Sequence, residues 1–258
     1  SINNNTVPAI TIYGGTITAK GGGSCSGIGG GMNRGNGTIK IYGGTITANG
    51  GSDSAGIGGG DDGDVDNPII IYGGNVTAYG NNGGAGIGGG NDGQVSAPIR
   101  IYGGTVNADA SNSTNGAGIG GGEDGSVNAV IEIYGGDVTA IGGCYSAAIG
   151  SGKNGNVNAA IRIYGGTVTA DGDHDGGSSS SVGIGAGYGN VNDVIEIYGG
   201  SVYATGNVKA PGIGAAYSSS SPKAGTVNIY GGYVEATSLG RAAAPIGGGH
   251  NVPGGTVN

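Results

Sequence analysis

Apolar residues along this chain follow one short pattern that is written eight times. Each repeat begins with I-x-I-Y-G-G, continues with x-V-x-A and later reaches G-[AS]-G-I-G-G-G; the copy at 163–170 reads IYGGTVTA. Within each piece, apolar positions recur with a period of two, which is typical of strands and not of helices. Glycine pairs and Asp-Gly or Asn-Gly dipeptides between the pieces predict turns.

The distance between successive copies predicts the fold class. The tyrosines of the phrase are separated by 29 to 34 residues, and a period of this size indicates a solenoid. Several short strands and turns per repeat predict an all-β, right-handed parallel β-helix of about eight coils, since parallel connections strongly prefer that hand. Residues 1–258 then form one β-helical domain. Because the chain opens inside the pattern and stops where another copy would begin, we expect a fragment of a longer protein.

One column of charges supports stacking of the coils in register. The residue between the two isoleucines of I-x-I is Arg100, Glu132, Arg162 and Glu196 in four successive repeats. In-register coils would place these side chains one above another, where alternating signs attract and like signs repel. The column therefore favours parallel, in-register pairing.

Composition limits both the core and the partners. Glycine makes up 68 of 258 residues, and the chain has no Trp or Phe, so the core must consist of Ile, Val and Ala. The net charge is −8 with nine basic residues, which argues against nucleic acid as a partner because phosphates require clustered Lys and Arg. No apolar run approaches the roughly 18 residues of a membrane span, so membrane insertion is not expected.

The phrase IYGG-x-V-x-A followed by GAGIGGG resembles glycine-rich β-helix repeats in secreted and surface proteins of Gram-positive anaerobic bacteria. That resemblance extends from Ile10 to Gly249. It implies an extracellular or cell-surface module that binds carbohydrate or acts as an adhesin. The fold alone does not fix the function, so two alternatives stay open: a structural stalk or filament segment, and a polysaccharide lyase or glycoside hydrolase.

The polar positions of x-V-x form a strip on the outside of the predicted rod. Nine of these sixteen positions are Thr; Thr also suits strands, so structure alone could select it. Regular hydroxyls interrupted by aromatic rings would suit a polysaccharide. We expect the glycan-binding residues to be Thr167, Thr169, Tyr203, Tyr233 and Glu235.

The tyrosines of the IYGG phrase form a column of their own. An outward ladder could stack on sugars, but packing of the rings at the corner beside the two glycines is the expectation we prefer. The eight members are Tyr13, Tyr42, Tyr72, Tyr102, Tyr134, Tyr164, Tyr198 and Tyr230.

Two groups of carboxylates suggest a calcium cofactor. Asp171, Asp173 and Asp175 alternate before a glycine, as at the start of an EF-hand loop, although Val182 stands where that loop has its bidentate Glu. Asp62, Asp92 and Asp124 share one column, where a cation would relieve their mutual repulsion. The alternative is a solvated loop and edge.

The GAGIGGG pieces allow two interpretations. Glycine around a single isoleucine fits a tight corner, or else a flat wall that could receive a ligand or a second rod by side-by-side self-association.

Basic residues are few and scattered, and no Ser-His-Asp or Cys-His set stands out. We therefore expect a non-catalytic protein.

Overall fold

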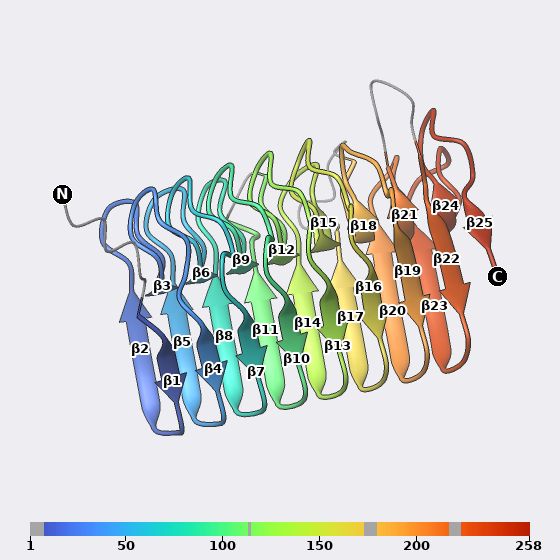
Figure 1. Cartoon of the computed structure of the whole chain (residues 1–258). Coiled ribbons are helices and arrows are strands. Elements are labelled where there is room, and N and C mark those ends of the chain that lie inside the picture. Colours follow the sequence, from blue (N-terminus) through green and yellow to red (C-terminus); the bar gives the residue numbers. More distant parts are fainter. Residues whose placement is uncertain (1–7, 113–114, 173–179, 217–222) are drawn as a thin grey trace.

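The computed structural model describes residues 8–112, 115–172, 180–216 and 223–258, and these form a rod of stacked coils. Each coil contributes one strand to each of three parallel sheets that run along the rod (Figure 1). The described residues contain no helix, and therefore none that could span a membrane. The predicted all-β parallel solenoid of eight coils is confirmed.

The three sheets follow the three apolar pieces of the repeat. The first sheet contains I-x-I: β1 (Ile10–Ile12), β4 (Ile39–Ile41), β7 (Ile69–Ile71), β10 (Ile99–Ile101), β13 (Ile131–Ile133), β16 (Ile161–Ile163), β19 (Val194–Ile197), β22 (Thr226–Ile229) and β25 (Thr256–Val257). The second contains x-V-x-A: β2 (Thr16–Lys20), β5 (Thr45–Asn49), β8 (Asn75–Tyr79), β11 (Thr105–Asp109), β14 (Asp137–Ile141), β17 (Thr167–Asp171), β20 (Ser201–Gly206) and β23 (Tyr233–Ser238). The third contains the isoleucine of GAGIGGG: β3 (Ile28–Gly29), β6 (Ile57–Gly58), β9 (Ile87–Gly88), β12 (Ile119–Gly120), β15 (Ala147–Gly150), β18 (Val182–Ala186), β21 (Ile213–Ala215) and β24 (Ile246–Gly248).

Successive coils pair in register, so that each repeat position becomes a column. Ile101 pairs with Ile71 on one side and with Ile133 on the other, and all three are fully buried. A single coil has no partner for its Ile and Val side chains, whereas stacking buries them in one continuous core along the rod. A further column of buried valines joins successive coils through isolated parallel bridges, running through Val65, Val95, Val127, Val157 and Val191.

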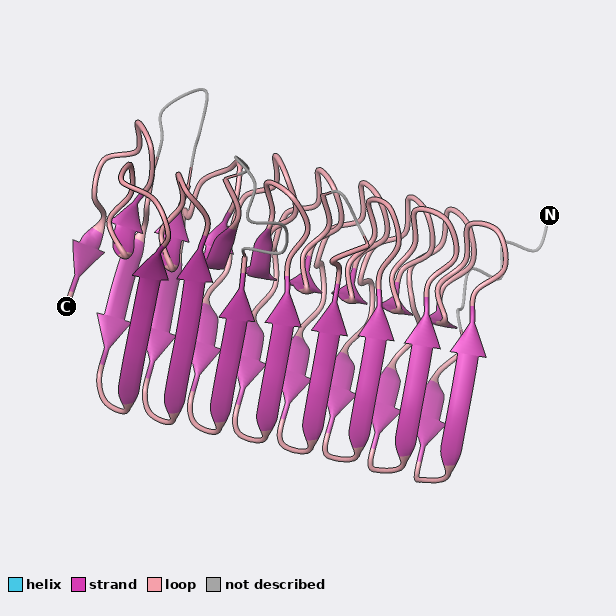
Figure 2. Ribbon diagram, turned by 180° about the vertical axis from the view of Figure 1, so that it is seen from behind, coloured by secondary structure: helices cyan, strands magenta, loops and turns pink. Residues whose placement is uncertain are grey.

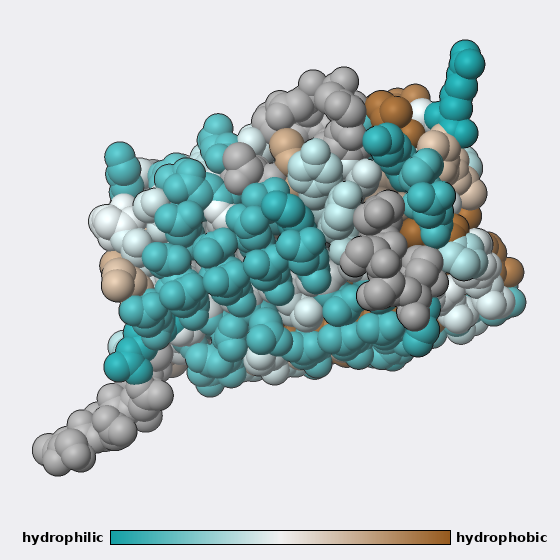
Figure 3. Space-filling model, turned by 90° about the horizontal axis from the view of Figure 1, so that it is seen from above, coloured by the Kyte–Doolittle hydropathy of each residue, from teal (hydrophilic) through white to brown (hydrophobic). Residues whose placement is uncertain are grey.

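The two long edges of the rod differ. At one edge the I-Y-G-G turn connects the first sheet to the second by the same tight bend in every coil (Figure 2). At the opposite edge the longer loops around the third sheet gather, and this face is largely hydrophilic, with apolar side chains gathering toward the C-terminal end (Figure 3).

Glycine is required by backbone geometry at two positions of the repeat. The second glycine of IYGG has a positive φ, 93° at Gly104, and a Cβ there would lie 2.5 Å from the carbonyl oxygen of Gly74. The glycine after the isoleucine of the third sheet has a φ of 151° at Gly88, where a Cβ would collide with the Gly120 carbonyl oxygen. These residues let neighbouring coils approach to strand-pairing distance.

Candidate functional site

The outer face of the second sheet carries three parallel rows of side chains, most of them polar. Valine and alanine of x-V-x-A point inward and are buried along most of the sheet, so the alternate residues point outward. Register fixes the rows at the C-terminal end, where Thr167 pairs with Ser201, and Ser201 with Tyr233. The predicted glycan-binding residues all lie on this face of β17, β20 and β23.

The middle row places Tyr203 between Thr169 and Glu235. Tyr203 and Tyr233 are therefore diagonal neighbours on adjacent strands. Their ring centroids lie 5.7 Å apart with an interplanar angle of 51°, and the side chains are 38% and 54% exposed. Because the rings do not stack on each other, they leave aromatic surface open to solvent.

The hydroxyl of Tyr233 is held by the carboxylate of Glu235. It donates a hydrogen bond to Glu235 Oε2 at 2.9 Å, and this bond is the main reason that the pKa of Tyr233 lies above its ordinary value. The bond connects the first and middle rows of the face, and it orients the ring of Tyr233 next to that of Tyr203. Two aromatic rings, one carboxylate and the Thr hydroxyls of β17 thus share one polar surface.

The tyrosines of IYGG form a stacked ladder along the tight-turn edge. Adjacent ring centroids lie 4.6 to 5.3 Å apart with interplanar angles of 7° to 20°. Seven of the eight are 37–79% exposed, and Tyr164 is half-buried. The expectation that they pack against the corner is wrong: the rings pack on one another. The six inner rings consequently have a neighbouring ring on both faces, and their edges and hydroxyls face the solvent; Tyr13 and Tyr230, at the two ends of the ladder, each stack on one ring.

The predicted charge column runs beside this ladder. Glu132 pairs in register with Arg100 and Arg162, and Arg162 pairs with Glu196. Arg Nε donates to Glu Oε2 at 2.7 Å in the Arg100–Glu132 pair and in the Arg162–Glu196 pair. The bond from Arg162 is the main cause of the lowered pKa of Glu196, which also accepts a hydrogen bond from the Tyr230 hydroxyl at 3.4 Å.

The acidic column lies in the loops at the opposite edge. Asp62, Asp92 and Asp124 have φ values of 55°, 57° and 50°, a conformation that Asp and Asn adopt more readily than other side chains. Burial, followed by the charges of its two Asp neighbours, raises the pKa of Asp92. Asn154 ends the column and donates to Asp124 Oδ1 at 2.7 Å. The corner geometry thus accounts for Asp at these positions without a ligand.

The calcium prediction finds no supporting cluster of ligands among the described residues. Among the described residues, no group of three or more His, Cys, Asp or Glu side chains could hold a metal ion. Asp171 lies at the end of β17, on the same outer face as Thr167 and Thr169. Asp173 and Asp175 lie outside the described residues, so the EF-hand-like loop stays a prediction.

The glycine-rich wall is not a surface. Gly58, Gly88 and Gly120 are buried within the third sheet, where a Cβ on each would meet the backbone of the next coil. Glycine at these positions lets neighbouring coils approach closely, and the side-by-side association predicted through this wall loses the exposed face on which it depended.

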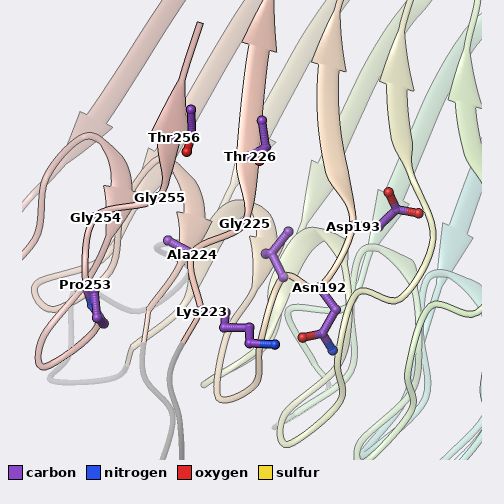
Figure 4. Close-up of a pocket in the computed structure, with 11 residues that line it drawn as sticks. Asn192, Asp193, Lys223, Ala224, Gly225, Thr226, Pro253, Gly254, Gly255 and Thr256 are labelled. Carbon is purple, nitrogen blue, oxygen red and sulfur yellow. The ribbon is translucent and has the colours of Figure 1, made fainter.

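An open pocket of 420 Å³ lies at the entry to β19, β22 and β25. It is lined by residues 191–193, 223–226 and 253–256, and Lys223 extends toward Asn192 within it (Figure 4). Most of the lining is backbone and small side chains, with one amine and one carboxylate, Asp193. The residues predicted to bind glycan are not among those that line it.

Sequence reasoning missed a ladder of side-chain amides on the loop side. Asn192 donates to Asn158 Oδ1 and Asn158 to Asn128 Oδ1, each at 2.8 Å, and Asn128 donates to Gln94 Oε1. The signal was present, since Asn follows the column valine in three successive repeats. These amides bond to one another, which indicates a role in holding the coils in register.

The comparisons with known proteins bear on the fold. A family model described as "Beta helix repeat" matches eight segments: residues 10–32, 39–61, 69–91, 99–123, 131–153, 161–188, 195–217 and 227–250. No curated protein and no solved structure matches the chain. The matched segments each begin at or next to the I-x-I strand of one coil and together cover most of the chain. The chain therefore belongs to the beta helix repeat family.

Proposed function

We propose that this protein is a non-catalytic, extracellular module that binds a glycan polymer along the outer face of the second sheet. The observation that supports this most directly is the pair Tyr203–Tyr233, whose rings are exposed and not stacked on each other. Sugars bind proteins through apolar contact of their C–H faces with aromatic rings, combined with hydrogen bonds to their hydroxyls. Glu235, Thr167 and Thr169 supply such hydrogen-bonding groups on the same face.

The architecture of the rod suits a polymer. Each row on this face repeats one side-chain position per coil, at the strand spacing of about 4.8 Å. A polymer that lies along the rod would contact several coils at once, and linked contacts give an affinity that no single contact reaches. The upstream rows, from β2 to β17, are mostly Thr and Asn and would add hydroxyl and amide contacts.

The tyrosine ladder fits this role less well. Its rings are more numerous, yet each of the six inner rings has a neighbouring ring on both faces, at centroid distances of 4.6 to 5.3 Å. A sugar could reach only the edges and hydroxyls of these six rings. The ladder and the charge column are better explained as devices that align the coils.

A depletion experiment tests the proposal. The purified chain is mixed with insoluble plant, microbial and mucin glycans in matched calcium and EDTA buffers, and the protein left in solution is measured. Selective depletion by one glycan class is the expected result. Loss of that depletion in EDTA would indicate that glycan binding depends on calcium. Equal depletion in both buffers would indicate that it does not.

The second candidate, a structural stalk, predicts a different result. A stalk needs only the self-aligning columns, such as the ion pairs of Arg100 and Arg162 at 2.7 Å. It should be depleted by no glycan in either buffer, and that outcome would refute the binding proposal. Release of reducing or unsaturated ends from any polysaccharide would instead make the protein an enzyme.

A further inference from the structure

We infer that the Tyr203–Tyr233 pair selects a neutral glycan whose chain turns between successive sugars, in preference to a flat or acidic chain. This inference rests on the proposed function and adds the class of ligand. It follows from three features of the described residues: the angle between the two rings, their separation, and the carboxylates that surround them.

The ring angle restricts the shape of the ligand. The two ring planes are inclined by 51°, so two sugars that lie flush on them must be inclined to each other by a similar amount. Successive sugars of an extended β-1,4-linked glucan present parallel faces, and such a chain could lie flush on only one ring. A chain that twists between residues, such as an α-1,4-linked or β-1,3-linked glucan, can contact both.

The ring separation indicates adjacent sugars. The centroids lie 5.7 Å apart on neighbouring strands, slightly more than the strand spacing of about 4.8 Å. One sugar residue in a glycan chain covers a comparable length. The pair therefore matches two consecutive sugars and not two distant ones. The rotation between successive sugars is thus the property by which the pair would distinguish glycans.

The orientation of the rings is fixed from one side. The hydrogen bond from Tyr233 to Glu235 Oε2 at 2.9 Å ties the ring of Tyr233 to its own strand. A fixed ring loses less conformational freedom on binding than a free one, and it cannot easily turn to become parallel with Tyr203. The inner ladder tyrosines show the contrasting case, because their rings are nearly parallel and have a neighbouring ring on both faces.

The charge around the pair argues for a neutral ligand. Glu235 lies within the site. Asp137 in β14 and Asp171 in β17 lie on the same outer face of the sheet. The described residues of the three C-terminal strands of this face, β17, β20 and β23, include no Lys or Arg. Carboxylates accept hydrogen bonds from sugar hydroxyls but repel a glycan that carries uronic acids.

The test compares soluble glycans of equal length and different geometry. Binding of the chain to α-1,4- and β-1,3-linked gluco-oligosaccharides is measured by calorimetry beside β-1,4-linked gluco- and manno-oligosaccharides and oligogalacturonate. We expect one of the turning, neutral chains to bind about tenfold or more tightly than either extended chain, a difference of roughly 1.4 kcal/mol. We expect oligogalacturonate to bind more weakly still.

A variant and its control connect the preference to the pair. Tyr203→Ala should remove most of the discrimination between turning and extended chains, while Tyr145→Ala, which removes an exposed tyrosine in the loop between β14 and β15, outside this sheet face, should leave it unchanged. Equal or tighter binding of an extended or acidic chain by the parent protein would overturn this inference and leave the proposed function standing. Binding of none of these ligands, together with no depletion by the wider glycan panel, would refute both.

Discussion

Neutralising Glu132 should destabilise the rod more than neutralising a comparable carboxylate elsewhere. Glu132 is 7% exposed and lies in the middle of the charge column, with Arg100 on one side and Arg162 on the other. The substitution Glu132→Gln keeps the size of the side chain and one acceptor oxygen, but replaces the other oxygen with an NH2 donor and removes the charge. Arg100, which donates to it at 2.7 Å, then loses its carboxylate partner.

The magnitude follows from burial on the two sides of the pair. An exposed ion pair contributes about 0.2–1 kcal/mol, and breaking a fully buried one costs about 3–5 kcal/mol. Here the Glu132 side chain is nearly buried, whereas the Arg100 side chain retains 32% of its exposure, so solvent still stabilises the orphaned guanidinium. We therefore expect a loss of about 1–2 kcal/mol in the free energy of unfolding, between these two limits.

The matched control is Glu123→Gln. Glu123 accepts a longer hydrogen bond from Lys153 at 3.3 Å, and the Lys153 and Glu123 side chains are 32% and 27% exposed. Because solvent screens both charges, we expect a loss of less than about 0.5 kcal/mol in the free energy of unfolding. Urea unfolding followed by circular dichroism measures both variants at pH 7. Equal stability of the Glu132→Gln and Glu123→Gln proteins would contradict the in-register charge column.

Four further perturbations test the remaining features of the fold. Gly88→Ala should cost about 3 kcal/mol or more or prevent folding, because its φ of 151° and the Gly120 carbonyl oxygen exclude a Cβ, while Gly73→Ala should be tolerated in the same urea assay. Tyr102→Ala should lose two stacking contacts and about 1–2 kcal/mol, with a visible decrease in the near-UV circular dichroism of the ladder. Asp92→Asn should raise stability slightly at pH 7, because partial burial, followed by the charges of Asp124 and Asp62, raises the pKa of Asp92 and so disfavours its ionised form in the folded state. Since Asp92 is exposed, solvent screening limits this gain to at most a few tenths of a kcal/mol, and it should vanish below the ordinary pKa of 3.8, where the carboxyl is neutral in both states. Glu196 has a lowered pKa in the folded protein, so its ionised form stabilises the fold fully above its ordinary pKa of 4.5, and this stabilisation is lost as the pH falls through the lower folded pKa. The stability of Glu196→Gln should therefore fall less with decreasing pH in an acid-unfolding experiment.

The fold could be predicted because the repeat constrains it twice. The period-two pattern of I-x-I specifies a strand with both isoleucines inward, and the near-constant distance between copies specifies stacking. The alternation of Arg100, Glu132, Arg162 and Glu196 then gave the register, and the structure pairs these same positions. Glycine at positive φ, as at Gly104, could be anticipated only as a turn signal.

The candidate sites could be predicted less completely. Register places Tyr203 and Tyr233 on one outer face, as the sequence indicates, but the angle of 51° between their rings depends on side-chain rotation, which no pattern of residues specifies. The tyrosines of the ladder were expected to pack against the corner beside the two glycines, but they stack on one another, because identical rings at strand spacing lie within stacking distance. The glycine-rich wall was expected to be exposed and is buried for a similar reason. Whether a glycine faces the solvent or the next coil depends on how the chain folds back, which the residue pattern does not specify.

The most direct test of glycan binding on the second sheet compares two variants with the glycan that depletes the parent protein most. Tyr203→Ala/Tyr233→Ala removes both rings from the site, and the control Tyr145→Ala removes an exposed ring from the loop between β14 and β15, outside this sheet face. Thermal unfolding first establishes that both variants are folded. Our account predicts at least about tenfold weaker binding for the double variant and unchanged binding for Tyr145→Ala. Full affinity in the double variant would contradict the site on which the proposed function depends.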